Sequence, residues 1–407
     1  MEPASITFVR HGETEANAAD VWQGHGDSPL TPRGERQAKA FGRRVQRQYF
    51  DTIVTSDLGR AVATTEAVDR PFVADAAWRE LDMGEWDGMA REHIFSEYAD
   101  LLAELQAGRD IRWGGAESYG EFVARVDAAV DSVGSSLLPG QRALVITHGG
   151  VIHAAVAGLL GFRGRPRPWP VGRITNTSMT TIDVAPRQLR VFNDTGHLDL
   201  DLEPRPSDSP SVKLVRHGET AANVRGWWHG TTDLDLTPTG ESQAQAVANS
   251  IADVGNLVAS PSLRAQRTAA AIGERHGIGH ETDARLGEMD FGAWEGLTTA
   301  EIRDQFPDEW DAVSNGTDIA RGGSGETFSE VGDRMMAAMR AIAARGPTST
   351  AVTHGGSIRV LTLNALGLDH RGSSLVALPD NTSTTSLVIR DDRVELKDFN
   401  SAAHLEA

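Results

Sequence analysis

The feature that most constrains this chain is an internal repeat. Val9–Thr14, with the sequence VRHGET, recurs 206 residues later as Val215–Thr220. Thr147–Gly150, with the sequence THGG, recurs at the same offset as Thr353–Gly356. This period is too long for a solenoid, whose repeats span about 20 to 50 residues. We therefore expect two tandem copies of one domain.

The boundary between the copies is predicted at residues 201–211. This segment contains three prolines and several small polar residues, a composition typical of a semi-stiff linker. We expect a first domain over residues 1–200 and a second over residues 212–407, each folding independently. The two copies are also expected to pack together as an intramolecular pseudo-dimer.

Strand and helix patterns alternate along each copy. Short apolar runs at 6–9 and 212–215 predict buried strands that end at Arg-His-Gly. Thr-Pro starts helices at 31–45 and 237–251. Strands at 143–147 and 348–353 end at a second histidine, and strands at 177–184 and 382–389 are expected to be the last ones. The fold class predicted is α/β, with two tandem three-layer α/β/α domains, each on a mostly parallel central sheet. Ligands bind at the carboxyl ends of such strands, where both histidines fall.

Composition excludes several classes of function. The chain has no cysteine, which removes disulfides, thiolate metal sites and cysteine nucleophiles. Its net charge is −18, and a strongly acidic chain is a poor partner for nucleic acid. The sequence has no apolar run of the ~18 residues that a membrane span needs. It also has no signal-peptide pattern at Met1–Ser5. We expect a cytoplasmic protein with no membrane or nucleic-acid partner.

Each copy contains the same ordered set of polar residues. An Arg-His-Gly ends the first strand, a helix-borne arginine follows the second, a glutamate precedes Gly-x-Trp-acid-Gly, and Thr-His-Gly-Gly ends a later strand. The members are Arg10, His11, Arg60, Glu80 and His148 in the first copy, and Arg216, His217, Arg264, Glu288 and His354 in the second. The two histidines of each copy are 137 residues apart. A single three-residue match would mean little, but the doubled order and spacing indicate a functional site.

The motifs RHGET, LTPxGxxQA, SxxRA and THGG together resemble the histidine phosphatase superfamily, which has the phosphoglycerate mutase-like fold. The resemblance covers nearly the whole chain, once per half, and implies phosphoryl transfer through a phosphohistidine. It implies that His11 and His217 are the nucleophiles and that Glu80 and Glu288 are the proton donors. The phosphate pockets that it implies comprise Arg10, Asn17, Arg60 and His148, and Arg216, Asn223, Arg264 and His354.

These residue types suit that chemistry. A neutral imidazole is a competent nucleophile near neutral pH, provided that its other ring nitrogen has an acceptor that fixes the tautomer. Guanidinium groups match the non-bridging phosphate oxygens, and a second histidine can stabilise their charge. An alkoxide leaving group needs a carboxylic acid nearby. Because the cationic side chains supply the neutralisation, we expect no metal ion and no cofactor.

The function predicted is a metal-independent phosphatase that hydrolyses small phosphorylated metabolites at two active sites. Neither copy has the basic insertion, with a tyrosine and paired arginines, that glycolytic mutases of the family share. A phosphoglycerate mutase-type transferase remains the enzymatic alternative. A tandem phosphate-ester binding protein with one inactive copy is the non-enzymatic alternative, although no member of either set is missing.

The two copies are not identical around this set. The second copy has Pro261 where the first has Asp57, and we infer one more residue before Arg264. Specificity for the leaving group is expected to lie in the segments 80–119 and 288–328, which differ most between the two copies. Asn176 and Asn381, which begin the predicted last strands, are interpreted as structural.

Overall fold

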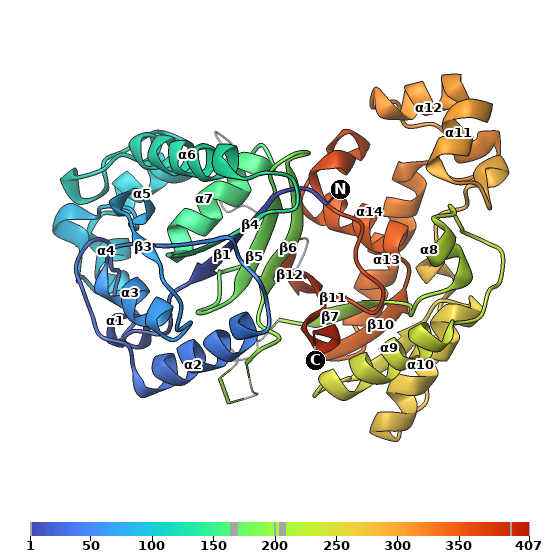
Figure 1. Cartoon of the computed structure of the whole chain (residues 1–407), viewed down its shortest axis with the longest axis horizontal. Coiled ribbons are helices and arrows are strands. Elements are labelled where there is room, and N and C mark those ends of the chain that lie inside the picture. The colour runs from blue at the N-terminus through green and yellow to red at the C-terminus, as the bar shows by residue number, and fades with distance from the viewer. Residues whose placement is uncertain (1, 163–169, 199–200, 203–208, 391–392, 407) are drawn as a thin grey trace. The chain divides into compact units, whose positions relative to one another are not determined.

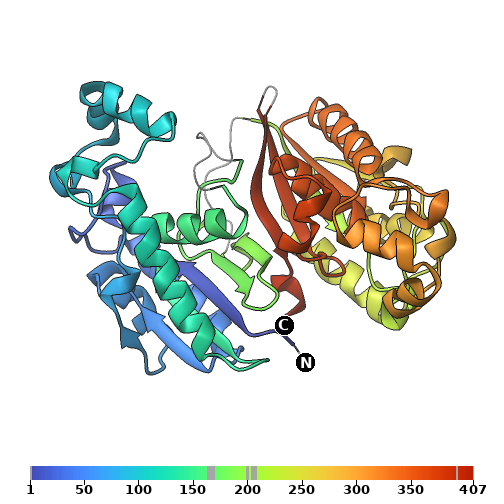
Figure 2. The same cartoon turned by 90° about the horizontal axis from the view of Figure 1, so that it is seen from above.

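The computed structural model describes residues 2–162, 170–198, 201–202, 209–390 and 393–406. It divides the chain into two compact units, one from residues 1–169 and 173–204 and the other from residues 170–172 and 205–407. Most of the linker predicted at 201–211 lies outside the described residues. Figures 1 and 2 show the two units.

The first unit is built on one mixed sheet. Its strands are β1 (Ser5–Arg10), β2 (Thr52–Thr55), β3 (Val73–Ala74), β4 (Arg142–Thr147), β5 (Met179–Asp183) and β6 (Gln188–Asp194). They lie in the order β3-β2-β4-β1-β5-β6. The first four strands along the chain pair in parallel, whereas β5 and β6 pair antiparallel. The predicted α/β class with a mostly parallel sheet is confirmed.

Helices cover both faces of this sheet (Figure 1). They are α1 (Glu15–Ala18), α2 (Pro32–Gln46), α3 (Gly59–Glu66), α4 (Arg91–Glu97), α5 (Ala99–Gln106), α6 (Tyr119–Ser136) and α7 (Gly149–Leu159). On one face, Phe41 of α2 and Ala61 of α3 share a buried cluster with Val9 and Ile146 of the sheet. Helices α6 and α7 contact β1 as well. Because neighbouring strand residues point to opposite faces, this arrangement produces three layers.

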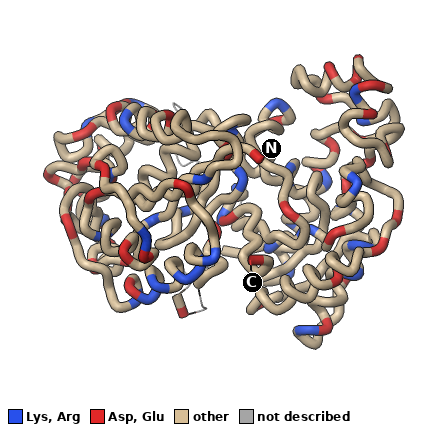
Figure 3. The backbone as a smooth tube through the Cα atoms, viewed as in Figure 1, with Lys and Arg blue, Asp and Glu red and all other residues tan. Residues whose placement is uncertain are grey.

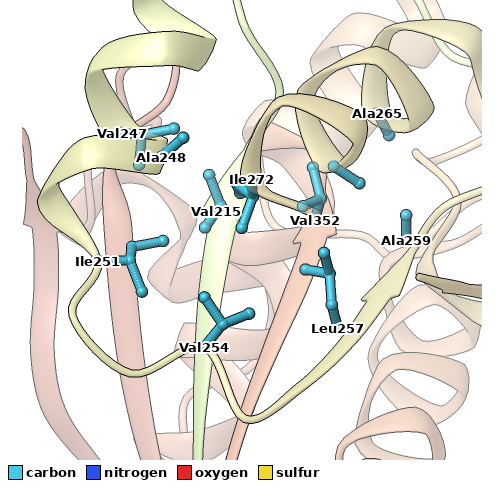
Figure 4. Close-up of a cluster of buried hydrophobic side chains, with 11 residues drawn as sticks. Val215, Val247, Ala248, Ile251, Val254, Leu257, Ala259, Ala265, Ile272 and Val352 are labelled. Carbon is cyan, nitrogen blue, oxygen red and sulfur yellow. The ribbon is translucent and has the colours of Figure 1, made fainter. Parts of the chain in front are cut away.

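The second unit has the same plan. Its strands are β7 (Ser211–Arg216), β8 (Asn256–Ala259), β9 (Glu281–Thr282), β10 (Thr348–Thr353), β11 (Thr384–Arg390) and β12 (Arg393–Ser401), in the order β9-β8-β10-β7-β11-β12. Its helices are α8 (Ala221–Arg225), α9 (Pro238–Ser250), α10 (Leu263–His276), α11 (Thr299–Gln305), α12 (Pro307–Ser314), α13 (Phe328–Ala343) and α14 (Gly355–Ala365). Figure 4 shows Val247 of α9 and Ile272 of α10 against Val215, Leu257 and Val352 of the sheet. Burial of this apolar surface stabilises the layer.

Local sequence signals explain where the long helices begin. Thr31 caps α2, and its side chain accepts a hydrogen bond from the backbone N–H of Gly34, with proline as the first helical residue. Helix α6 begins at a capping box formed by Ser118 and Glu121. Both devices satisfy N–H groups that have no partner within the helix. The helices predicted at 31–45 and 237–251 therefore agree with α2 and α9 to within about one residue at each end.

The expectation that 177–184 and 382–389 are the last strands is wrong. Each is followed by one more strand, β6 or β12, which pairs antiparallel with it. An antiparallel neighbour needs only a short connection, so it adds a strand without the helical crossover that marks the earlier ones.

Charged residues of both signs are interspersed over each unit (Figure 3). Within the described residues, no helix combines the length and the apolarity needed to cross a membrane.

Candidate active sites

In each unit, two histidines lie side by side at the carboxyl ends of neighbouring strands. His11 directly follows β1 and His148 directly follows β4, and these strands pair in parallel. The ring centroids of His11 and His148 are 5.2 Å apart. Those of His217 and His354 are 5.1 Å apart. All four side chains are buried. The folding of each copy thus brings together residues that are far apart in the sequence.

The first histidine of each pair has a defined tautomer. Nδ1 of His11 lies 2.8 Å from the carbonyl oxygen of Gly12, and Nδ1 of His217 lies 2.7 Å from that of Gly218. A carbonyl oxygen can only accept, so Nδ1 has the proton and Nε2 has the free lone pair. The requirement for an acceptor that fixes the tautomer is met by the backbone in both units.

Both of these histidines are neutral. The pKa of His11 lies well below its ordinary value of 6.5, because burial disfavours the charged ring and the guanidinium groups of Arg60 and Arg10 repel it further. The pKa of His217 is lowered for the same reasons, with burial as the largest cause. A buried neutral imidazole with a free lone pair has the properties of a nucleophile.

Two arginines of the first unit are held by backbone carbonyls. Arg10 donates from Nη1 to Ile174 at 2.7 Å, and Arg60 donates to Gly24 at 2.7 Å and to Gly26 at 2.8 Å. Neither guanidinium forms an ion pair with the described residues, and the Nε of each is buried without a hydrogen-bond partner there. Burial lowers the pKa of Arg10 to about 10, so it stays charged at neutral pH. Two buried cations without a carboxylate partner are costly unless an anion binds between them.

The second unit holds its arginines in the same way. Arg216 donates to the carbonyl oxygen of Pro379. Arg264 donates to Gly230 at 2.8 Å and to Thr232 at 3.1 Å. Their Nε atoms are likewise buried without a partner in the described chain. The pattern of anchored arginines is therefore a property of the domain.

The predicted acid of the first unit lies against the N-terminus of α7. Oε2 of Glu80 accepts from the backbone N–H of Gly150 at 2.8 Å, and Oε1 accepts from Leu81 at 2.9 Å. A Cβ at Gly150 would lie 2.1 Å from Oε1. Position 150 therefore accepts no larger residue while the carboxyl group occupies this place.

The acid of the second unit has more hydrogen-bond donors. Glu288 accepts from the N–H groups of Met289 and Gly356 at 2.9 Å each. It also accepts from the N–H of Ser357 at 2.9 Å and from its hydroxyl at 3.1 Å. The first copy has Val151 at the position of Ser357, so the two acids differ in their support.

Asn17 joins three parts of the first site. Its Oδ1 accepts from Nη2 of Arg10 at 3.3 Å and from Nδ2 of Asn176 at 3.1 Å. Asn176 also donates to the carbonyl oxygen of His11 at 2.9 Å. In the second unit, Asn381 donates to the carbonyl oxygen of His217 at 3.0 Å and to Asn223 at 3.2 Å. These hydrogen bonds agree with a structural role for Asn176 and Asn381, and they place both beside the first histidine of each site.

A serine that no sequence motif singled out lies beside the second histidine of each site. Oγ of Ser56 lies 2.8 Å from Nε2 of His148, and Oγ of Ser260 lies 2.7 Å from Nε2 of His354. Each serine precedes the site arginine by four residues, so the inferred extra residue before Arg264 is wrong. That shared spacing is the signal that could have identified the serines. Burial lowers the pKa of His148 and that of His354 well below the ordinary value of 6.5, so both of these histidines are neutral.

An arginine of each unit holds the backbone at the predicted acid. Arg125 donates to the carbonyl oxygen of Glu80 at 3.2 Å and to that of Arg79 at 2.8 Å, and it pairs with Glu117 at 2.8 Å. Arg334 donates to the carbonyl oxygen of Glu288 at 3.0 Å. The sequence shows these arginines as part of a repeated pattern. It does not predict their hydrogen-bond partners, which lie about 45 residues away along the chain.

The polar residues of the first unit line a cavity of about 490 Å³. Arg10, His11, Asn17, Arg60 and Glu80 are all among its lining residues. The same cavity has an aromatic part made of Trp22, Trp113, Tyr119 and Phe122, and an outer part with the exposed residues Arg91 and Arg173. A cavity of this size suits a small phosphorylated molecule. Over the described ranges, no group of three or more His, Cys, Asp or Glu side chains is placed to hold a metal ion.

Mild acid is expected to destabilise both units. The pKa of all four site histidines is lower in the fold than its ordinary value of 6.5. Between the folded and the unfolded pKa of a histidine, the unfolded chain binds more protons. The contribution of these histidines to stability is therefore fully present well above pH 6.5 and is lost progressively as the pH falls through it. The loss approaches ~1.4 kcal/mol per histidine for each pH unit. Thermal unfolding between pH ~7 and pH ~5 measures it, above the range where most carboxylates titrate. As a control, the dependence of the melting temperature on pH should be the same in His93→Gln, which changes an exposed histidine. A melting temperature that does not change over this pH range would contradict the burial of neutral histidines.

Known proteins are similar to this chain. The family model of the histidine phosphatase superfamily, branch 1, matches residues 6–195 and 212–402. Probable phosphoglycerate mutases of Salmonella choleraesuis and Salmonella enteritidis are each 34% identical over 208 residues, which are 48% of this chain and 94% of the relative. A mycobacterial glucosyl-3-phosphoglycerate phosphatase in complex with VO3 is similar at 30% identity, covering 48% of this chain and 100% of its own, with a TM-score of 0.43. The phosphoserine phosphatase of Entamoeba histolytica with 3-phosphoglyceric acid is similar at 27% identity, covering 48% and 99%, with a TM-score of 0.44. The chain therefore belongs to the histidine phosphatase superfamily, branch 1, with two tandem copies of the family's domain.

Proposed function

We propose that the protein is a metal-independent phosphatase of small phosphomonoesters with two active sites. The observation that supports this most is the repeated constellation of a neutral histidine, two arginines anchored by backbone carbonyls and a glutamate at a helix N-terminus. A phosphoryl group placed between the arginines would meet the free Nε2 of His11 or His217. In-line placement and charge stabilisation are the main requirements of phosphoryl transfer.

The reaction has two steps. First, Nε2 of the histidine attacks phosphorus, the P–O bond to the alcohol breaks, and Glu80 or Glu288 gives its proton to the departing alkoxide. The phosphoryl group is then bonded to the ring nitrogen. Second, a water molecule attacks phosphorus, its proton passes to the glutamate carboxylate, and the P–N bond breaks. Inorganic phosphate is released, and both the histidine and the glutamic acid return to their starting states.

The second histidine of each site stabilises the transferring group. His148 is neutral, and the hydroxyl of Ser56 can donate to its Nε2, which leaves the proton on Nδ1. This Nδ1 is buried without a partner among the described residues, as is Nδ1 of His354. An N–H donor in such a place can bind an equatorial phosphate oxygen, where a preorganised donor is most effective.

Hydrolysis is favoured over transfer to a second oxygen by the composition of the first cavity. A mutase must retain the dephosphorylated alcohol while the phosphoryl group moves, whereas a phosphatase only needs water at the phosphohistidine. The cavity is lined by aromatic residues and by the exposed residues Arg91 and Arg173, so we infer that the alcohol leaves readily and that water has access. Mutase activity is the second candidate because curated relatives are named probable phosphoglycerate mutases.

A screen of phosphorylated metabolites that records both phosphate release and isomerised product tests this proposal. We expect phosphate as the main product and full activity in excess EDTA. Brief incubation with a labelled substrate should leave acid-labile phosphate on the protein, the signature of a phosphohistidine. Loss of activity with EDTA and recovery with a divalent metal would contradict the mechanism. Isomerised product without free phosphate would identify a mutase.

A further inference from the structure

The two sites differ at one position of the helix that follows the second histidine. His153 of α7 lies five residues after His148 and lines the first cavity. The residue at the same distance after His354 is Arg359 of α14. The change replaces an imidazole by a permanent cation.

Arg359 lies on the helical turn that holds the acid. The N–H groups of Gly356 and Ser357 bind Glu288, and Arg359 follows Gly356 by three residues, which places both on one side of the helix. Arg359 is partly buried. Its guanidinium is close enough to interact electrostatically with Glu288 and Arg321, and burial lowers its pKa.

Arg359 makes no hydrogen bond and no ion pair with the described residues, unlike the other cations around it. Nη1 of Arg321 donates a hydrogen bond to the carbonyl oxygen of Ile319 and lies 3.7 Å from Oδ1 of Asp318. The phosphoryl site already contains Arg216 and Arg264. Among the described residues, ionised Glu288 is therefore the group that balances the charge of Arg359, and it does so without a hydrogen bond.

The imbalance is largest in the state that starts the reaction. Glu288 must be protonated in order to give a proton to the leaving alcohol, and a protonated carboxyl group no longer balances Arg359. An unpaired cation that is partly removed from water is costly. Because Glu288 acts on the alcohol oxygen, an anion beside Arg359 would belong to the alcohol and not to the transferring phosphoryl group.

We propose that the second copy acts on phosphomonoesters whose alcohol has a second anionic group, a carboxylate or another phosphate, bound by Arg359. This inference rests on the proposed function. The first copy, with His153 and an aromatic part of its cavity, has no such requirement, so the two sites divide their substrates by the charge of the alcohol.

The experiment uses His11→Ala protein, in which only the second copy can turn over. Three probes separate the sources of the anion: phosphoglycolate has a carboxylate on the alcohol, ethylene glycol bisphosphate has a second phosphate, and ethyl phosphate has neither. We expect the ratio of kcat/KM for an anionic probe to that for ethyl phosphate to fall by roughly 10- to 100-fold in Arg359→Gln. Arg359→Lys should recover part of it. Arg340→Gln, a change of an exposed arginine on α13, should leave it unchanged.

The reciprocal change strengthens the test. In His217→Ala protein, where the first copy acts alone, His153→Arg should raise the same ratio. Thermal unfolding of every variant identifies those that fail to fold. A ratio that is equal in the parent and in folded Arg359→Gln overturns the inference, and a loss for only one anionic probe identifies the source of the anion.

Failure of the proposed function is distinguishable from failure of this inference. If His11→Ala protein hydrolyses none of the three probes, the second copy is not a phosphatase for them. Binding of phosphoglycolate and ethyl phosphate to the His11→Ala, His217→Ala double variant, measured by calorimetry with and without Arg359→Gln, then decides. A selective loss of phosphoglycolate affinity supports the anion site, and no change contradicts it.

Discussion

Replacing both His11 and His217 by alanine is expected to abolish phosphatase activity, while each single replacement leaves activity on at least one substrate. Each histidine has its own pair of anchored arginines and its own acid, so neither site needs groups from the other. Removal of a covalent nucleophile costs on the order of 10⁶-fold in kcat in a well-studied hydrolase. A panel of phosphomonoesters assayed with the three variants measures this.

The same panel contains its own control. His93 is an exposed histidine of α4, and His93→Ala should behave like the parent protein on every compound. If one single variant loses as much activity as the double variant on all substrates, only one copy is catalytic. The alternative of a tandem with one inactive, ligand-binding copy would then hold.

Changing both acids to glutamine is expected to reduce hydrolysis of alkyl phosphates by ~10²–10⁴-fold. The amide keeps the shape of Glu80 and Glu288 but cannot give a proton to the alkoxide. Aryl phosphates should lose far less, because a phenolate departs without a proton. The effect should appear in kcat, since the acid acts only after binding.

Both oxygens of each acid accept backbone hydrogen bonds, so the amide nitrogen of the variant meets one N–H donor. Thermal unfolding measures the resulting loss of stability separately from the loss of proton transfer. Glu85→Gln, at an exposed position near Glu80, is the matched control and should act like the parent. Equal losses on alkyl and aryl phosphates would assign the glutamates to binding or packing.

The doubled motifs predicted most of the architecture because they lie where strands end. A short apolar run followed by Arg-His-Gly fixes both the strand and the position of His11. The same applies to His148, and parallel pairing of these strands brings the two together. A helix that begins at Thr-Pro is equally local. These features depend on neighbours in the sequence, which a pattern can detect.

The features that the sequence did not predict depend on distant partners. Asn176 forms a hydrogen bond with Asn17, which is 159 residues away in the sequence. Ser56 and His148 are hydrogen-bonded although 92 residues separate them in the sequence. Neither asparagine nor serine is distinctive where it stands. The strands β6 and β12 were missed because a hairpin strand needs no crossover helix. That Arg359 has no hydrogen-bond or ion-pair partner among the described residues can be seen only from the positions of the surrounding groups.

In the first site, His11 and the two arginines are held largely by main-chain oxygens, which every residue type supplies. Gly12, Ile174, Gly24 and Gly26 anchor the first site through their carbonyl groups. Side chains on the alcohol side can therefore be exchanged without moving the phosphoryl-binding frame. This modularity makes the tandem chain an internally controlled scaffold for enzyme engineering. One half can be redesigned for a new leaving group while the other, on the same polypeptide, reports expression, folding and assay conditions.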